Sequence, residues 1–290
     1  MRGTISLLML MFLCSVTACA QDMSGNHNHS AASSDNMVSQ EWAKQRVEKS
    51  PRHREWVKVK NGAREVNSFV VYPENKNKAT AVIVIHEIFG MSDWVQSLTD
   101  QLAEAGYVAI APDLLSGMGP NGGGTSSLSG NAVGQAIRDL PPDQITADLN
   151  AVADYISKVP ASNGKIVVTG YCWGGGQSFR YATNNPNVKA AFVFYGPAPA
   201  SADGTPDKTA LARIKAPVYG FYAGNDARIN ATLPKTTEAM TELKKTYDPV
   251  TYEGAGHGFM RAGEAPDANE ANKKARDEAW ARWKKILAGV

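Results

Sequence analysis

The strongest constraint on the fold of this 290-residue chain is the segment TGYCWGGGQS at residues 169–178. It follows an apolar run at residues 165–168, which predicts a buried strand, and it leads into residues 178–182, which predict the start of a helix. A strand, a sharp turn of the pattern G-x-C-x-G and a helix predict a nucleophile elbow, with Cys172 in the place usual for serine. Glycines around such a turn let the strand and the helix pack closely at a strained backbone.

Residues 1–20 have the features of an export signal. An apolar run at residues 5–13 follows the positively charged Arg2 and has the length of a signal-peptide core. This run is too short to span a bilayer as a helix. The sequence therefore predicts an exported bacterial protein.

Two cleavage sites are compatible with this signal. Residues 16–19 (VTAC) resemble a bacterial lipobox, which would leave Cys19 as a lipid-modified first residue and anchor the protein to the membrane. Residues 18–20 (ACA) also match the small-x-small site of ordinary secretory cleavage, which would release a periplasmic protein that starts at Gln21. The Ser-, Asn- and His-rich segment that follows favours the lipobox, and ordinary secretory cleavage is the alternative.

Cys172 is expected to be the only free thiol of the mature protein. Cys14 leaves with the signal, and Cys19 is either lipid-modified or removed. Thiols tend to oxidise outside the cytoplasm, so an unpaired cysteine there needs an explanation. A buried structural cysteine is one explanation, but the position of Cys172 in the elbow favours a reactive thiol.

The charge composition argues against binding of nucleic acid. The chain has 30 basic and 28 acidic residues, whereas a nucleic-acid-binding surface needs a strongly basic field. The three glycines at residues 174–176 lack the lysine of a phosphate-binding loop and the spacing of a dinucleotide-binding loop. We therefore expect no nucleic acid and no nucleotide, and the sequence implies no metal and no organic cofactor.

The chain is expected to consist of the signal at residues 1–20, a flexible polar tether at residues 21–50 and one domain at residues 51–290. Within the domain, buried strands alternate with helices, which predicts an α/β fold with a doubly wound, mostly parallel sheet and helices on both faces. Residues 116–130, rich in Gly and Ser, predict a long surface loop. The expected strands lie at residues 56–59, 65–71, 81–85, 107–111, 165–168, 188–195, 217–223 and 249–253, and the expected helices lie at residues 93–105, 143–159, 232–247 and 269–287 and from residue 178.

Two later loops supply the partners that a nucleophilic thiol needs. In hydrolases with such an elbow, an acid and then a histidine follow the nucleophile, each in a loop after a strand. Asp226 follows the expected strand at residues 217–223, and His257 follows the one at residues 249–253. We expect His257 to take the proton from Cys172 and Asp226 to hold the imidazole in the required tautomer.

Backbone N–H groups are expected to complete the site. The N–H of Trp173, at the start of the elbow helix, lies where it can stabilise an oxyanion, and the N–H of Ile88 is the expected second donor. A helix N-terminus also lowers the pKa of a cysteine, so we expect a lowered pKa for the Cys172 thiol.

Four motifs, taken together and in this order, resemble those of the dienelactone hydrolase family. They are HEIFG at residues 86–90, GYCWGG at residues 170–175, GNDAR at residues 224–228 and GAGHGF at residues 254–259. The resemblance extends over residues 50–290. It implies an α/β-hydrolase fold and a catalytic triad at Cys172, Asp226 and His257.

The resemblance also implies roles for charged residues. A glutamate of the family contacts the resting cysteine and helps to control thiolate formation, and Glu87 matches its position. Family enzymes that open dienelactone bind the substrate carboxylate with arginines, one of them four residues after the catalytic histidine, where this chain has Arg261. Arg228 and Arg138 are candidates for a second arginine, with a surface or structural salt bridge as the alternative. The family's serine after the histidine is Gly258 here, which leaves the substrate open.

The residues and the resemblance together predict a cysteine-dependent hydrolase of small ester or lactone substrates that works through a thioacyl-enzyme. A thioesterase or a peptidase with the same triad is one alternative. A non-catalytic envelope binding protein on the same fold is another, because a fold does not determine a function.

Overall fold

One eight-stranded sheet forms the centre of residues 39–290, which are the residues that this computed structural model describes. The strand order is β1-β2-β4-β3-β5-β6-β7-β8. β2 pairs antiparallel with β1 and with β4, whereas all pairs from β4 to β8 are parallel. The strands are β1 (Arg54–Asn61), β2 (Arg64–Val71), β3 (Ala79–Ile85), β4 (Val108–Pro112), β5 (Ser162–Tyr171), β6 (Ala191–Phe194), β7 (Val218–Ala223) and β8 (Tyr247–Tyr252).

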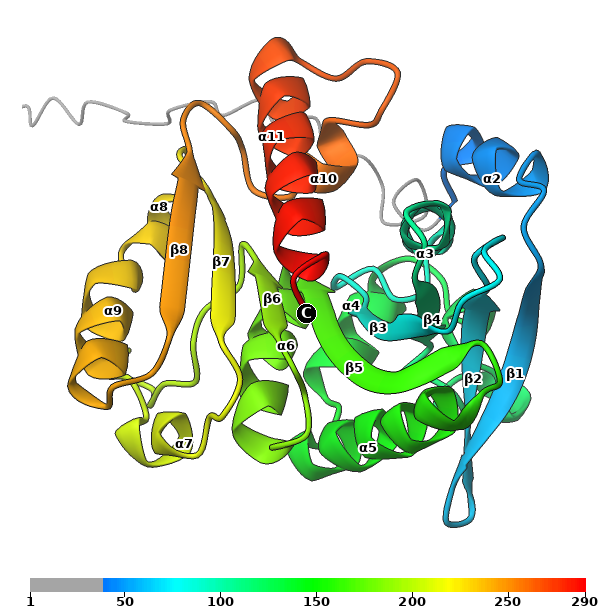
Figure 1. The fold of residues 1–290 in the computed structure, drawn as a ribbon, viewed down its shortest axis with the longest axis horizontal. Helices are drawn as coiled ribbons and strands as arrows, with labels where there is room; N and C mark the ends of the chain where they lie inside the picture. Colours follow the sequence, from blue (N-terminus) through cyan, green and yellow to red (C-terminus); the bar gives the residue numbers. More distant parts are fainter. Residues whose placement is uncertain (1–38) are drawn as a thin grey trace, which may run out of the picture. The chain divides into compact units, whose positions relative to one another are not determined.

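Helices cover both faces of this sheet (Figure 1). Because successive side chains of a strand point to opposite faces, Ile83 and Ile85 of β3 pack in one apolar cluster, and Val82 and Val84 pack in the other. The first cluster includes residues of α4 (Asn131–Arg138), α5 (Pro142–Lys158), α6 (Trp173–Asn184), α7 (Lys208–Ala212), α8 (Ala227–Asn230) and α9 (Leu233–Glu242). The second includes residues of α2 (Glu41–Glu48), α3 (Asp93–Glu104), α10 (Phe259–Ala262) and α11 (Glu270–Leu287). The predicted doubly wound sheet is confirmed.

The predicted tether is too long at its C-terminal end. Residues 41–48, assigned above to the tether at 21–50, form helix α2. Its small apolar residues Ala43 and Val47 are buried against the cluster that contains α3. Because most of the other side chains in α2 are polar and exposed, the sequence of this helix resembles that of a solvated linker. The domain therefore starts before residue 51.

Other elements also differ from the expected ones: α4, α7, α8 and α10 were not predicted, and α9 ends earlier than expected. Helix α4, which was not predicted, follows the loop at residues 116–130, and its buried Val133 and Ile137 lie one turn apart. Helix α9 ends at Glu242, before the predicted end at residue 247, and Lys244 just beyond it adopts a left-handed backbone with φ 54°. The sequence showed the apolar spacing of α4, but it was too short to outweigh the glycine-rich surroundings.

The loop at residues 116–130 is tied to the end of β4 by a buried carboxylate. Oδ2 of Asp113 accepts a hydrogen bond from the N–H of Thr125 (2.8 Å), and Oδ1 accepts from the Thr125 hydroxyl (2.7 Å) and from the N–H of Leu115 (3.1 Å). The N–H of Met91 donates to the same Thr125 hydroxyl (3.1 Å), which links this loop to the segment after β3. The long loop is therefore held against the carboxyl end of the sheet.

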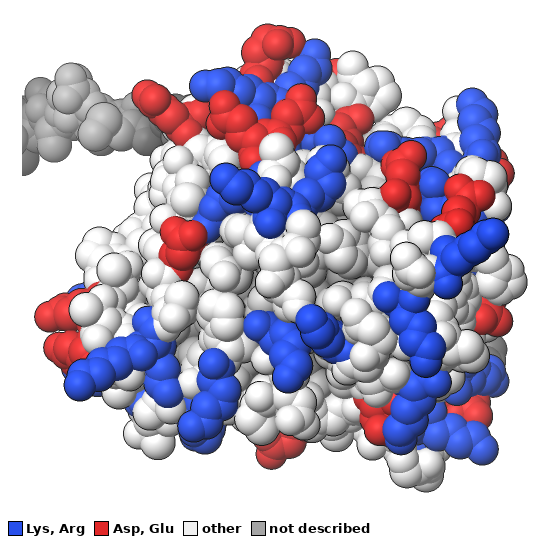
Figure 2. All heavy atoms as spheres, in the orientation of Figure 1, with Lys and Arg blue, Asp and Glu red and all other residues white. Residues whose placement is uncertain are grey.

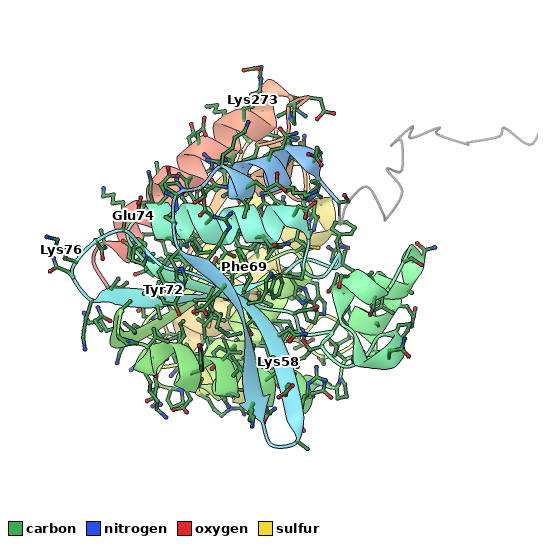
Figure 3. The ribbon with its side chains drawn as sticks, turned by 90° about the vertical axis from the view of Figure 1, so that its right-hand side faces the viewer. Lys58, Phe69, Tyr72, Glu74, Lys76 and Lys273 are labelled. Atoms are coloured by element: carbon green, nitrogen blue, oxygen red, sulfur yellow. The ribbon has the colours of Figure 1, made fainter. Side chains whose placement is uncertain are left out.

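The β1–β2 hairpin lies at one edge of the sheet, and it faces the viewer in Figure 3. Lys58 of β1 pairs with Glu65 of β2 (3.0 Å) at this edge. Charged side chains on an edge strand discourage further strand pairing. Phe69 is buried beneath the half-exposed Trp56, with ring centroids 5.3 Å apart, so the hairpin is also fixed by aromatic packing.

Charged side chains on the face seen in Figure 2 lie in several separate groups. Acidic and basic side chains alternate near the start of α11, where Lys273 pairs with Glu270. This distribution fits the nearly balanced composition of the chain, with a formal net charge of +2. Among the described residues, no helix combines the length and the apolar character that a membrane span requires.

We predict that Asp113→Ala destabilises the domain by about 2–4 kcal/mol, because three buried donors lose their acceptor. Urea unfolding measures the change. The exposed Asp267, for which no hydrogen bond or ion pair is found within the described part of the chain, gives the control Asp267→Ala, which should stay within about 0.5 kcal/mol of the parent protein. Equal midpoints for the two variants would contradict the role of Asp113 as a clamp.

Candidate active site

The sharp turn predicted at Cys172 is present between β5 and α6. Cys172 has φ 57° and ψ −117°, a conformation that residues other than glycine adopt only where the surrounding structure imposes it. Neighbouring glycines make this turn sterically feasible: a Cβ atom on Gly170 would lie 1.9 Å from the carbonyl oxygen of Gly174. A Cβ on Gly174 would lie 2.4 Å from the carbonyl oxygens of Ile85 and His86. The start of α6 therefore packs directly against the end of β3.

Asp226 and His257 meet at the same edge of the sheet. Asp226 follows β7, and its Oδ1 accepts from the N–H of Ile229 (3.3 Å) as the N-terminal cap of α8. Its Oδ2 lies 2.5 Å from Nδ1 of His257, which follows β8. The side chain of Asp226 is 6% exposed and that of His257 is 33% exposed. A carboxylate at Nδ1 requires the proton there, which leaves Nε2 of His257 as the basic nitrogen.

The Cys172 sulfur faces two backbone amides. The N–H groups of Trp173 and Ile88 both interact with it and favour its charged form, and the positive charge of Arg228 has the same effect. Burial and the negative charge of Glu87 act more strongly in the opposite direction, so the pKa of the Cys172 thiol is raised to about 11. The expectation of a lowered pKa was wrong, because the helix N-terminus does not compensate for burial.

Within the described residues, no hydrogen bond joins the Cys172 sulfur to His257. The site therefore has two separate parts, a sulfur against two amides and an Asp226–His257 pair.

Comparison with known proteins gives the family. The model of the dienelactone hydrolase family matches residues 66–290, which is most of the chain. The chain belongs to the dienelactone hydrolase family. It is therefore an ester or lactone hydrolase, and the resemblance inferred from its four motifs is confirmed.

Named relatives agree with this assignment. A protein of Saccharolobus solfataricus, provisionally named carboxymethylenebutenolidase, is 30% identical over 258 residues, which cover 78% of this chain and 95% of the relative. A protein of Methylorubrum extorquens with the same provisional name is 31% identical over 201 residues, which cover 67% of this chain and 68% of the relative. A crystal structure from Klebsiella pneumoniae, provisionally described as a dienelactone hydrolase, matches with a TM-score of 0.71 and 26% identity over 82% of this chain and 99% of its own.

Glu87 and Arg261, which the family resemblance singled out, form a buried ion pair. Nε of Arg261 donates to Oε2 of Glu87 at 2.8 Å, and the side chains are 15% and 2% exposed. The Glu87 charge is also the largest cause of the raised pKa of Arg261. The guanidinium lies 5.3 Å from the centroid of the Phe89 ring, which further fixes it. Arg261 is therefore engaged by the protein itself, next to the thiol.

The other two candidate arginines are exposed. Arg228 lies on α8, two residues after Asp226, and no ion pair to it is found among residues 39–290. Its positive charge nevertheless acts on Cys172 and favours a lower pKa of the thiol. Arg138, at the end of α4, lines a small hollow of about 150 Å³ together with Ile88. Of these two arginines, Arg228 is therefore the one whose charge acts on the thiol.

Sequence analysis missed Tyr195, which follows β6 at the same edge of the sheet. Tyr195 is fully buried and has a left-handed backbone with φ 42°. Its ring meets the His257 imidazole edge to face, with centroids 5.0 Å apart, and it packs in the same way on Phe259 at 5.3 Å. The signal was its position directly after a buried strand, where the other site residues also lie.

Two further predictions concern lipid modification and metal binding. Cys19, the candidate for lipid modification, lies outside the described residues. Within residues 39–290, no group of three or more His, Cys, Asp and Glu side chains is arranged to hold a metal ion.

We predict that Glu87→Gln lowers the pKa of the Cys172 thiol from about 11, because the variant lacks a negative charge that favours the neutral thiol. A decrease of about one pKa unit makes alkylation by iodoacetamide about tenfold faster at any pH well below the pKa. The pH profile of the alkylation rate measures this shift. Glu253→Gln, which changes an exposed glutamate after β8, is the control and should keep the original profile. An unshifted Glu87→Gln profile would exclude Glu87 from control of the thiol.

Proposed function

We propose that this member of the dienelactone hydrolase family hydrolyses small esters or lactones by nucleophilic catalysis. Cys172 is the proposed nucleophile, His257 the general base and acid, and Asp226 the residue that orients the imidazole. Acyl transfer to the sulfur would give a thioacyl-enzyme, which water then hydrolyses.

The observation that carries this proposal is the bond between Asp226 Oδ2 and His257 Nδ1 at 2.5 Å, at the edge of the sheet where Cys172 lies. A buried carboxylate that fixes the imidazole tautomer is what a histidine base requires. A binding protein would need neither this pair nor a cysteine held in a strained turn. The sulfur also lies against two amides of the kind that stabilise an oxyanion.

The proposed reaction begins with a rotamer change that moves the thiol from the amides towards His257. Nε2 of His257 takes the thiol proton, and the thiolate attacks the substrate carbonyl carbon. The carbonyl oxygen, now an oxyanion, occupies the space that the sulfur has left beside the N–H groups of Ile88 and Trp173. The tetrahedral intermediate collapses, the C–O bond to the leaving group breaks, and His257 gives its proton to the leaving alkoxide.

Water completes the cycle. His257 removes a proton from a water molecule, and the resulting hydroxide attacks the thioester carbon. The second tetrahedral intermediate releases the carboxylic acid, and the sulfur regains a proton from His257. Every proton taken up by the imidazole is returned within the cycle, so no cofactor or metal is required for balance.

Glu87 is proposed to keep the thiol neutral until substrate arrives. Its carboxylate raises the pKa of Cys172, and after burial it is the largest cause of that shift. A neutral thiol that makes no hydrogen bond to a base is a poor nucleophile and is also less readily oxidised. Movement of the sulfur away from Glu87 would remove part of this effect at the time when the thiolate is needed.

We predict that Cys172→Ala reduces hydrolysis of p-nitrophenyl esters by about 10⁴-fold or more, as expected when a triad nucleophile is removed. Asp226→Asn should reduce kcat by about 10³- to 10⁴-fold, because the amide favours the wrong imidazole tautomer. The rate of p-nitrophenol release measures both effects, and mass spectrometry detects the acylated protein.

A series of acyl chain lengths ranks the substrates in the same assay. The parent protein should gain the mass of one acyl group on Cys172 when hydrolysis is slowed at low pH. Equal, slow release of p-nitrophenol by the parent protein and by Cys172→Ala would contradict the proposed ester hydrolysis. Thioesters and peptides would then be the next substrates to assay, since a triad of this kind can act on either.

The exposed Arg228 indicates that substrates with a carboxylate are favoured. We predict that Arg228→Gln raises KM for the p-nitrophenyl monoester of a dicarboxylic acid by about 2- to 5-fold, the magnitude expected for one exposed ion pair. KM for p-nitrophenyl acetate should stay unchanged. Lys235→Gln, which removes an exposed charge from α9, is the matched control. An equal effect of Arg228→Gln on both esters would contradict a role in recognising charge.

A further inference from the structure

His86 is a fully buried histidine directly after β3 and next to Glu87. Its Nδ1 lies 2.8 Å from the carbonyl oxygen of Glu87. A carbonyl oxygen can only accept a hydrogen bond, so Nδ1 of His86 carries the proton and donates it. Burial lowers the pKa of His86, which favours the neutral imidazole with this single proton.

The peptide group that accepts this bond also supplies one of the oxyanion donors. The carbonyl of Glu87 and the N–H of Ile88 belong to the same planar, trans peptide group, and they point to opposite sides of it. The Ile88 N–H faces the Cys172 sulfur. His86 therefore holds this peptide from the side opposite to the sulfur.

A hydrogen bond to a carbonyl increases the polarity of the whole peptide group, and in a low-dielectric interior this strengthens its N–H as a donor. The Glu87 carbonyl accepts a second bond, from the N–H of Gly90 (3.1 Å), which closes the turn after β3. The turn therefore keeps one bond of its own when His86 is changed. The contribution of His86 is to fix the peptide plane and polarise it.

His86 also contacts the residue that supplies the other oxyanion donor. Its ring stacks on the indole of Trp173, with centroids 5.5 Å apart and planes inclined by 16°. One imidazole thus bonds to the peptide of the first donor and packs on the side chain of the second. Within the described part of the chain, Nε2 of His86 has no hydrogen-bond partner, so an apolar ring would fill this place without burying an unsatisfied nitrogen.

We propose that His86 is a positioning residue of the oxyanion hole: its Nδ1–H orients and polarises the Glu87–Ile88 peptide, and its ring fixes Trp173. This inference rests on the proposed function, because the oxyanion is the species formed there. His86 acts through the two amides and does not touch the substrate. Removal of the Nδ1–H donor of His86 should reduce stabilisation of the transition state more than it reduces substrate binding.

Two variants separate the hydrogen bond from the packing. His86→Phe keeps a ring to stack on Trp173 but has no donor. His86→Asn has a side-chain amide whose nitrogen takes the place of Nδ1, and it therefore restores the donor without the ring. Loss of a whole oxyanion donor costs about 10²- to 10³-fold in kcat, so loss of its polarisation is expected to cost about 5- to 30-fold.

The test combines kinetics with infrared spectroscopy of the acylated full-length protein. We expect His86→Phe to lower kcat for p-nitrophenyl acetate by about 5- to 30-fold with KM within about twofold of the parent value. We expect the carbonyl stretch of its thioacyl-enzyme, identified by ¹³C labelling, to lie at higher frequency than in the parent protein, because a weaker N–H polarises the acyl carbonyl less. His86→Asn should recover most of kcat and the lower frequency.

Three results would overturn the inference. An unchanged carbonyl frequency in His86→Phe, with kcat also unchanged, contradicts the role of His86 but leaves the proposed function intact. A loss of kcat in His86→Phe that is just as large in His86→Asn shows that the hydrogen-bond donor does not account for the loss, and this contradicts the role of the bond. Failure to detect any thioacyl-enzyme on the parent protein contradicts both the proposed function and this inference.

A second pair of variants covers the case in which His86→Phe does not fold. His86→Asn carries its amide nitrogen near the place of Nδ1, whereas His86→Gln carries it near the place of Nε2. We expect His86→Asn to retain at least about fivefold more activity than His86→Gln. Equal activities of these two variants would contradict the proposal.

Discussion

The close approach of the start of α6 to the end of β3 is the constraint on which the site depends. Any side chain on Gly174 would collide with the carbonyl oxygens of Ile85 and His86, so the two backbones can meet only through glycine. This contact holds Cys172 at φ 57° and places the amides of Trp173, at the start of α6, and of Ile88, after β3, against one sulfur. A strained turn costs about 1–3 kcal/mol, and the packing of the parallel sheet around it offsets this cost.

Opposing electrostatic effects then determine the state of the thiol. Burial and the Glu87 charge favour the neutral form, whereas the two amides and Arg228 favour the charged form. The first group dominates, and the pKa of Cys172 is raised to about 11. In the proposed mechanism, a thiol that stays neutral in this position is less readily oxidised, and it moves towards His257 before it reacts. Activation and orientation of the proposed nucleophile are therefore the same event.

Local sequence predicted the sharp turn at Cys172, the strand ends and the meeting of Asp226 with His257, because each depends on a few neighbouring residues and on the rule that parallel strands end at one edge. Interactions between distant residues were not accessible in the same way. The ion pair between Glu87 and Arg261 joins positions 174 residues apart, and its geometry depends on the packing of the whole sheet. The pKa of Cys172 was mispredicted for a related reason, since burial is a property of the folded domain.

The differences from the family pattern lie around the proposed triad. Arg261 has the family spacing but is engaged by Glu87, so a substrate carboxylate would compete with an ion pair that is already formed. Gly258, where the family has serine, has φ 79°, a left-handed backbone that a side chain would strain. A Cβ there would lie 3.5 Å from Arg261 and 3.8 Å from Glu87, so the glycine leaves space beside this pair. Substrate preference is therefore expected to depend on the surroundings of this ion pair and on Arg228, while the geometry of the elbow determines the chemistry.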